Sequence, residues 1–189
     1  MFTEIINGIE LVFETANTSF SPLGVDKGTL AMLSIVDLSP SDKLLDLGCG
    51  YGVVGIYAAK LIGEQNVVML DNDPDYVNYA KKNAGLNGVA GISVILSNGF
   101  DDLHETDFSM ILCNPPYHTD FSVPKHFIEK GFNRLMTGGK MYVVTKRKDW
   151  YKNKLSAIFG GVKLNVINDY YVFCSEKRSA QYANMQKKK

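Results

Sequence analysis

The sequence predicts an α/β fold built on a doubly wound, mostly parallel seven-stranded sheet with an antiparallel C-terminal strand. Two observations predict it. From about residue 43, short apolar runs alternate with longer amphipathic stretches, which indicates βαβ units. The last two apolar runs follow each other directly, as in an antiparallel pair. Sheets of this kind bind ligands beyond the carboxyl ends of their strands, so the residues just past each strand are the candidates for function.

The first half of the pattern contains three strands and two helices. We expect strands at 43–48, 66–71 and 91–97, and helices at 53–63 and 73–88. Gly63 suits the end of the first helix. Asp73 is placed to cap the second helix, and Pro74 suits its first turn.

The second half continues the alternation and then closes the sheet. We expect strands at 108–114 and 140–146, and helices at 125–136 and 149–161, the first of these helices stopping before Gly138-Gly139. The runs at 162–168 and 170–176 form the antiparallel pair around an Asn168-Asp169 turn.

The pattern divides the chain of 189 residues into three parts. Residues 43–180 form the main domain. Residues 1–42 are expected to pack on its core and to contribute to the substrate side, and residues 181–189 are expected to be a basic disordered tail. Hydrophobic residues make up 46% of the chain and charged residues 21%, as in ordinary globular proteins. Lys plus Arg equals Asp plus Glu, at 20 each, which excludes an overall basic field but leaves a local basic patch open.

Cysteine usage and the N-terminus indicate a cytoplasmic protein. The three cysteines are far apart and form no Cys-x-x-Cys or Cys/His cluster, so neither a disulfide framework nor a metal site is expected. They are typical of reduced, buried thiols. The opening "MFTEIINGIE" lacks the basic and apolar regions of a signal peptide, and no apolar run is long enough to span a bilayer.

Three glycines at alternate positions follow the first strand, in "LLDLGCGYGVVG". Gly48, Gly50 and Gly52 can adopt positive φ and let a ligand approach the backbone, although a tight turn alone would also use glycine. Gly50, Gly52 and Gly55 also match the spacing G-x-G-x-x-G of dinucleotide loops. Asp46 lies two residues before the first glycine, where it would repel a pyrophosphate but suit a cationic amino-acid group.

Polar residues also follow the next two strands. Asp71, at the end of the second strand, can accept hydrogen bonds from ribose hydroxyls. Asp73 competes for that role but is better placed as the helix cap. After the third strand, Asn98 is a candidate for the edge of an adenine, and Phe100 is a candidate for the core.

The fourth strand is followed by Asn114-Pro115-Pro116-Tyr117. Two prolines can simply end a strand. Proline has no N–H, however, so the carbonyls of this segment are free to accept hydrogen bonds, and Asn114 adds a side-chain acceptor. Two acceptors beside an aromatic ring suit a planar group with an –NH2: its hydrogens would meet Asn114 Oδ1 and the Pro115 carbonyl, and Tyr117 would stack on its ring.

These residues, in this order and spacing, resemble the class I S-adenosylmethionine-dependent methyltransferases that methylate amino nitrogens. The upstream segment "SFSPLGVDKGTLAML" (19–33) resembles the pattern F-S-x-x-x-x-D-x-G-T-x-x-L of the "methyltransferase small" family, and "YYVFCSEKR" resembles that family's final strand. The resemblance covers roughly residues 11 to 178. It implies a Rossmann-like class I methyltransferase fold, with 43–180 as the catalytic domain, and S-adenosylmethionine as cofactor without a metal.

The resemblance also assigns roles to residues. The glycine loop and Asp46 would hold the methionine part of the cofactor, Asp71 the ribose, and Asn98 would lie near the adenine, where the family commonly has an aspartate. The cofactor-binding positions are Asp46, Gly48, Cys49, Gly50, Gly52, Asp71, Asn72, Asn98 and Gly99. The catalytic positions are Asn114, Pro115, Pro116 and Tyr117. The substrate-binding positions are Tyr117, His118, Lys125 and Arg147.

The family includes enzymes that make N2-methylguanine in ribosomal RNA, which is therefore the substrate that the resemblance implies. This chain departs from its pattern at Tyr117 and the following "HTDFSVPK", where relatives of similar length often have an aliphatic residue and then Gly-Lys. Adenine N6 in transfer RNA or DNA and protein glutamine N5 therefore stay open, as does a non-catalytic partner subunit. His118 is either a proton relay or a loop residue that contacts substrate. RNA is the expected partner, and a homodimer could supply further recognition surface.

Overall fold

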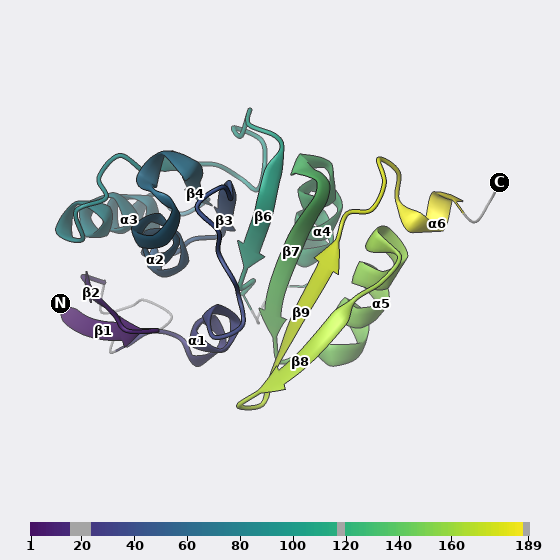
Figure 1. The fold of residues 1–189 in the computed structure, drawn as a ribbon, viewed down its shortest axis with the longest axis horizontal. Coiled ribbons are helices and arrows are strands. Elements are labelled where there is room, and N and C mark those ends of the chain that lie inside the picture. The colour runs from purple at the N-terminus through teal and green to yellow at the C-terminus, as the bar shows by residue number, and fades with distance from the viewer. Residues whose placement is uncertain (16–23, 117–119, 187–189) are drawn as a thin grey trace.

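The computed structural model describes residues 1–15, 24–116 and 120–186. A seven-stranded sheet forms its centre, in the order β5-β4-β3-β6-β7-β9-β8 (Figure 1). β3 to β7 are parallel along this order, and β9 runs antiparallel between β7 and β8. The strands are β3 (Leu44–Leu47), β4 (Val67–Asp71), β5 (Ser93–Leu96), β6 (Phe108–Cys113), β7 (Leu135–Thr145), β8 (Lys163–Ile167) and β9 (Tyr170–Glu176). The predicted sheet is confirmed.

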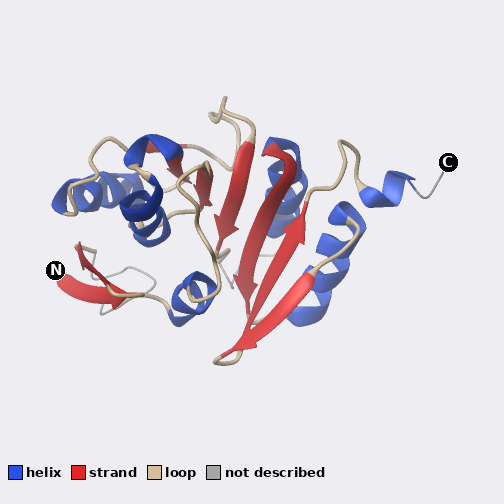
Figure 2. Ribbon diagram, in the orientation of Figure 1, coloured by secondary structure: helices blue, strands red, loops and turns tan. Residues whose placement is uncertain are grey.

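The helices are α1 (Lys27–Leu33), α2 (Val53–Ile62), α3 (Pro74–Leu86), α4 (Ser122–Arg134), α5 (Lys148–Phe159) and α6 (Ala183–Gln186), with a 3₁₀ turn at Glu64–Asn66. Helices α1 to α5 lie on the two faces of this sheet, and the short helix α6 lies beside α5 (Figure 2). Asp73 caps α3 by accepting from the Asp75 N–H at 2.8 Å, and Gly63 ends α2 at φ 90°, as predicted. Asn168 and Asp169, at φ 48° and 65°, form the turn between β8 and β9.

The predicted boundary between α4 and β7 is wrong by several residues. α4 begins at Ser122 rather than 125, because Pro124 falls in the first turn, where a missing N–H costs nothing. β7 begins at Leu135 rather than 140 and contains both glycines. Gly138 N–H donates to Lys177 O at 2.7 Å, and the register between β6 and β7 shifts here. The glycine pair is therefore an irregularity inside the strand and does not separate a helix from it.

Two further expectations need correction. Residues 183–186 of the predicted disordered tail form the short helix α6, which follows Tyr182. The Tyr182 ring packs against Phe132 of α4 with centroids 5.0 Å apart, which anchors the chain just before that helix. Cys49 and Cys113 are buried as expected, but Cys174 is only half-buried.

The sheet separates two hydrophobic cores. Residues of α1, α2, α3 and the N-terminal hairpin pack on one face, and residues of α4 and α5 pack on the other. Alternation along β3 assigns its side chains to these faces: Leu44 belongs to the first core, and Leu45 and Leu47 to the second. Asp46 therefore faces the α2 side, among apolar neighbours. Phe100 is buried in the second core, as predicted.

The N-terminal residues form a hairpin, β1 (Phe2–Ile6) and β2 (Ile9–Phe13), turned by Asn7-Gly8. Asn83 of α3 and Asn87, the residue that caps the C-terminus of this helix, hold the second strand of the hairpin. Asn83 Oδ1 accepts from Glu14 N–H at 2.8 Å, and Asn83 Nδ2 donates to Glu14 O at 3.0 Å. Asn87 makes the same pair of bonds with Val12, at 3.0 and 2.8 Å. These amides complete the open edge of β2 as a neighbouring strand would.

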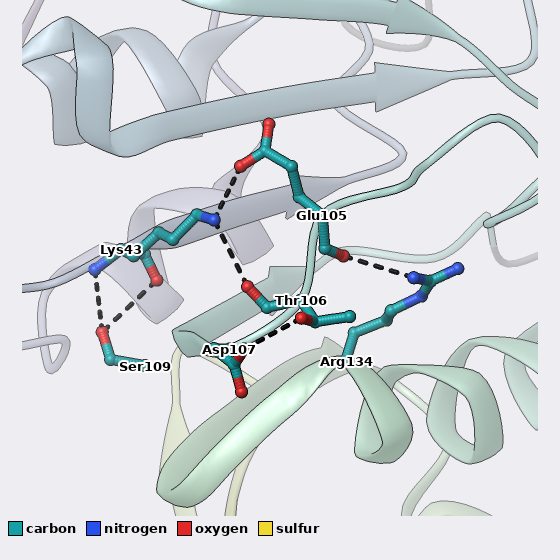
Figure 3. A network of polar contacts seen from close by, with 6 residues as sticks. All are labelled: Lys43, Glu105, Thr106, Asp107, Ser109 and Arg134. Atoms are coloured by element: carbon teal, nitrogen blue, oxygen red, sulfur yellow. Dashed lines mark hydrogen bonds and ion pairs between the residues drawn. The ribbon is translucent and has the colours of Figure 1, made fainter.

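A polar network joins the amino ends of the strands, on the edge of the sheet away from the glycine loop (Figure 3). Lys43 Nζ contacts Glu105 Oε2 at 2.7 Å and donates to Thr106 O at 3.3 Å. Arg134, the last residue of α4, donates to Glu105 O at 3.3 Å. The network ties β3, α4 and the segment before β6 together. Among the described residues, no helix has the length and apolarity needed to cross a membrane.

Candidate active site

A cavity of roughly 440 Å³ opens where β3, β4, β5 and β6 end. Eight of the nine positions predicted to bind a cofactor line it, and Gly52 is the exception. Asn114, Pro115 and Pro116 line it as well. Its walls also include Asp26 and Thr29 of the α1 region, Tyr76 of α3, and Val123 and Phe127 of α4. The sheet therefore collects in one place residues that are spread over most of the chain.

The glycine loop is shaped by positive backbone angles. Gly48, Gly50 and Gly52 have φ of 74°, 54° and 98°, which side chains with a Cβ rarely adopt. Gly48 N–H and Cys49 N–H donate to Leu70 O of β4 at 2.9 and 3.0 Å, so the loop is anchored on the neighbouring strand. Gly52 lies behind the cavity wall. A Cβ there would lie 3.0 Å from Ile56 Cδ1 of α2, tighter than an ordinary contact, so this glycine lets the loop pack closely on the start of α2.

Asp46 is a buried carboxylate at the inner end of the cavity, 3% exposed. Its Oδ2 accepts from the Gly55 N–H at 2.8 Å, in the first turn of α2. Burial raises the pKa of Asp46 to about 7, with a contribution from the nearby charge of Asp71, while the Gly55 bond acts in the opposite direction. Burial also raises the pKa of the Cys49 thiol well above its usual range, so that thiol stays neutral.

Asp71 stands at the end of β4, beside the loop. Its Oδ2 accepts from Gly50 N–H at 2.8 Å and its Oδ1 from Asp73 N–H at 3.0 Å. Desolvation raises its pKa although these bonds oppose the shift. Each oxygen of a carboxylate has a second lone pair, so Asp71 can still accept hydrogen bonds from a ligand. Asn72, exposed, lies next to it on the cavity wall.

The turn after β5 forms another part of the wall. Ser97 is buried, and its Oγ donates to Gly99 O at 3.1 Å and accepts from Asp102 N–H at 3.0 Å. Gly99 has φ of 62° and lies so close to His126 that a Cβ would be 2.9 Å from its Nε2. Asn98 is exposed, with its Nδ2 3.4 Å from Asp101 Oδ2. Asn98, the residue predicted to lie near an adenine, lines the cavity.

The predicted amine clamp lies at the end of β6. Asn114 is half-buried, and its Nδ2 donates to Asp26 Oδ1 at 2.8 Å and to Thr29 Oγ1 at 3.0 Å. Pro115 is buried and Pro116 exposed. Tyr117 and His118 lie outside the described residues.

Lys125 and Arg147 do not line the cavity. Lys125 is exposed on the first half of α4. Arg147, just before α5, places its guanidinium 5.1 Å from the centre of the Phe121 ring, which stacks on Trp150 at 4.4 Å. Phe121 directly precedes α4, so this basic and aromatic cluster lies at the start of that helix. No group of His, Cys, Asp and Glu among the described residues could hold a metal ion.

Two polar residues on the cavity, Asp26 and Thr29, were missed as functional residues. They belong to the segment that matches the pattern F-S-x-x-x-x-D-x-G-T-x-x-L. This pattern supports the family resemblance, but no role was assigned to either residue. That pattern was the available signal, since a short polar segment far from the strands offers no periodicity. The apolar residues Val123 and Phe127 were missed as well. Val123 falls before the predicted start of the helix at 125, and Phe127 lies inside that helix without a polar group to mark it.

The strand order and its single antiparallel strand, with a glycine loop and acidic residues at the carboxyl ends, define the Rossmann-like fold of class I methyltransferases. The methyltransferase small domain family matches residues 10–174. The chain belongs to this family.

Individual relatives agree with this assignment. The chain is 32% identical over 163 residues to ribosomal RNA small subunit methyltransferase C of Pseudoalteromonas atlantica, covering 84% of this chain and 47% of that protein. It is 29% identical to ribosomal RNA large subunit methyltransferase G of Alteromonas mediterranea, covering 83% and 41%. The solved T. thermophilus 16S rRNA N2 G1207 methyltransferase, in complex with AdoMet and guanosine, superposes with a TM-score of 0.80 at 27% identity, covering 94% and 50%. The chain thus spans about half the length of these relatives.

Proposed function

We propose that this chain is an S-adenosylmethionine-dependent methyltransferase that methylates guanine N2 in ribosomal RNA. The observation that carries the proposal is the position of Asn114, a fixed hydrogen-bonding amide, in the same cavity as Asp46 and Asp71. The T. thermophilus relative, whose structure holds AdoMet and guanosine, supports both the cofactor and the base. An enzyme with this substrate would act in the cytoplasm, on ribosomal RNA or ribosomal particles.

The cavity suits S-adenosylmethionine in size and chemistry. Its volume of roughly 440 Å³ lies in the range of small-molecule sites. Asp46 would bind the cationic amino-acid end, Asp71 and Asn72 the ribose, and Asn98 and Gly99 the adenine end. Backbone of the glycine loop would contact the methionine part. When bound, this cofactor supplies a methyl group on a positively charged sulfur.

The chain's own residues would activate the target amine by position. An exocyclic amine is conjugated with its ring, so its nitrogen is a poor nucleophile. Asn114 Oδ1 and the Pro115 carbonyl, as two acceptors, would bend the hydrogens out of the ring plane and restore lone-pair character at nitrogen. The nitrogen would take the methyl group as the bond between that methyl and the sulfur breaks, and the methylated nitrogen would then release its extra proton to solvent. Stacking by Tyr117 and proton relay by His118 stay predictions.

RNA recognition would involve the surface beside the clamp. Lys125 and Arg147 are exposed there, and the stack of Arg147, Phe121 and Trp150 would place a cation near the backbone of a bound strand. The target base would have to be unpaired or flipped out to reach the cavity. The N-terminal segment 1–42 would contribute through Asp26 and Thr29. A homodimer remains a separate expectation that light scattering of the purified protein would test.

The direct experiment measures methyl transfer to ribosomal particles. Purified protein, labelled cofactor and small or large ribosomal subunits from a strain lacking the gene would be incubated, and the RNA digested to nucleosides. We expect N2-methylguanosine by mass spectrometry. Label in N6-methyladenosine or in protein would show that the target is one of the alternatives and not guanine N2. No transfer to any of these targets would contradict the proposal.

Two substitutions should separate catalysis from cofactor binding. Asn114→Ala should lower the rate of transfer by about 100-fold or more while the cofactor binds as before, because the amide acts on the target amine. Asp71→Ala should do the reverse and weaken the cofactor about tenfold or more, since it removes a charged acceptor. Calorimetry and single-turnover rates measure both. Lost cofactor binding in Asn114→Ala would contradict this division of roles.

A further inference from the structure

The side-chain amide of Asn114 is held from one side by two residues of the N-terminal segment. Its NH2 group lies 2.8 Å from Asp26 Oδ1 and 3.0 Å from Thr29 Oγ1, so each of its hydrogens has an acceptor. An ionised carboxylate can only accept, so the nitrogen of the amide must face Asp26. The oxygen of the amide therefore points to the other side of Asn114.

We infer that Asp26 and Thr29 are positioning residues that fix the rotation of the Asn114 amide and thereby aim its Oδ1 at the target amine. This inference rests on the proposed function of Asn114. The terminal torsion of asparagine is broad and roughly two-fold, so without a partner the amide can turn over. A turned amide would present its NH2 to the amine of the substrate, and two donors cannot bond to each other.

The acceptors are themselves held in place. Asp26 caps α1, and the same Oδ1 that receives Asn114 also accepts from Thr29 N–H at 3.1 Å. Thr29 is 7% exposed, in the first turn of that helix. The bond from Asn114 to Asp26 is charge-assisted, which makes it the stronger of the two.

Gly28 explains how α1 comes close enough to reach Asn114. A Cβ at this position would lie 2.7 Å from the Tyr170 ring of β9 and 2.9 Å from Asp26 Oδ1. Gly28 lies between Asp26 and Thr29 in sequence. The helix therefore packs directly on the sheet at the point where these two residues hold the amide. The sequence Asp26-Lys27-Gly28-Thr29 supplies the cap, the close approach and the second acceptor within one helical turn.

Steady-state kinetics of four variants test the inference. Asp26→Ala removes the stronger acceptor and should lower kcat about 100-fold with the cofactor Kd unchanged. Asp26→Asn keeps an oxygen that can accept both bonds and should recover most of this loss. Thr29→Val should lower kcat less than Asp26→Ala does, and Thr29→Ser, which keeps the hydroxyl, should lower kcat less than Thr29→Val.

Asp42→Ala is the matched control. Asp42 also accepts two hydrogen bonds, from Ser109 Oγ and Ser39 N–H, each at 2.7 Å, but it lies at the amino ends of the strands. This variant should keep wild-type kcat even if it melts at a lower temperature. Wild-type kcat in Asp26→Ala, or an Asp26→Asn variant as slow as Asp26→Ala, would overturn the inference.

NMR of the Asn114 side chain tests the inference without any substrate. In protein labelled with ¹⁵N-asparagine, the NH2 signals of Asn114 are assigned by their loss in Asn114→Ala. We expect these signals to move and their protons to exchange faster in Asp26→Ala and Thr29→Val, and to stay in place in Asp42→Ala. Unchanged signals in Asp26→Ala would overturn the inference. A wild-type protein that transfers no methyl group would contradict the proposed function, while the NMR comparison would still decide the role of Asp26.

Discussion

At the scale of single residues, the buried carboxylate of Asp46 has the most consequential chemistry. Its pKa is raised to about 7, chiefly because burial penalises the charged form. Near neutral pH, the protein without ligand therefore carries a mixture of protonated and ionised Asp46. A cationic group bound beside it would favour the ionised form and lower this pKa.

Cofactor binding should therefore release protons in mildly acidic solution. At about pH 6 the free protein has a protonated Asp46, whereas an ammonium group, with a pKa near 8, requires its carboxylate form. Affinity should rise as pH increases toward about 7 and then level off. Calorimetry in two buffers of different ionisation enthalpy measures the released protons.

The matched variant is Asp46→Asn, which keeps an acceptor for the Gly55 N–H but has no proton to lose. It should bind the cofactor more weakly and with no proton release at the same pH. Equal apparent enthalpies in both buffers for the wild-type protein would show that Asp46 does not titrate on binding.

At the scale of elements, the hairpin and α3 meet through side chains. Asn83 is fully buried, and its amide bonds Glu14 on both the N–H and the C=O, while its Nδ2 also donates to Tyr51 O at 2.9 Å. Asparagine in the middle of a helix is usually unfavourable, so its presence here reflects these tertiary bonds.

Replacing Asn83 by alanine should destabilise the protein by about 1–3 kcal/mol, because it leaves the backbone N–H and C=O of half-buried Glu14 and the C=O of buried Tyr51 without their partner. Urea unfolding followed by circular dichroism measures this loss. Asn133→Ala is the control, since Asn133 is an exposed helical residue whose amide, among the described residues, donates to the Tyr182 hydroxyl at 3.3 Å. A loss for Asn83→Ala no larger than for Asn133→Ala would contradict the clamp.

The elements that the sequence predicts well are those with strong local patterns. β3, β4 and α2 follow from apolar periodicity, and the start of α3 follows from Asp73 and Pro74. The N-terminal hairpin was missed, although Asn7-Gly8 between two alternating runs is a strong hairpin signal. The boundary between α4 and β7 was misplaced because Pro124 and the Gly138-Gly139 pair were interpreted as breaks between elements. Pro124 is tolerated in the first turn of a helix, and the two glycines lie inside a bulged strand.

At the scale of the whole molecule, the topology explains which parts of the site could be predicted. Asp46, Asp71 and Asn114 follow strands, and a parallel sheet brings strand ends together whatever their separation in sequence. The contact between Asp26 and Asn114 joins residues 88 positions apart, through a helix that packs on the sheet from outside the βαβ pattern. No local spacing encodes that contact, so only the folded chain reveals it.

The two ends of the parallel strands hold different features. The carboxyl ends of the strands carry the cavity, whereas the amino ends carry the network of Lys43, Glu105 and Arg134 (Figure 3). The cavity and the polar network thus lie a strand length apart. This separation is the reason that Asp42 serves as a control for Asp26.

The Asn83 amide also links two parts of the molecule thermodynamically, since one nitrogen bonds both the hairpin, at Glu14 O, and the glycine loop, at Tyr51 O. A cofactor that orders the loop should therefore slow hydrogen exchange at the amides of β2, although no residue of β1 or β2 lines the cavity. If exchange there requires an opening that also loses the cofactor, protection should rise with cofactor concentration as 1 + [L]/Kd. Exchange mass spectrometry measures this rise, and protection of β2 that ignores the cofactor would refute the link. The hairpin would then report, at a distance, how much of the protein is loaded.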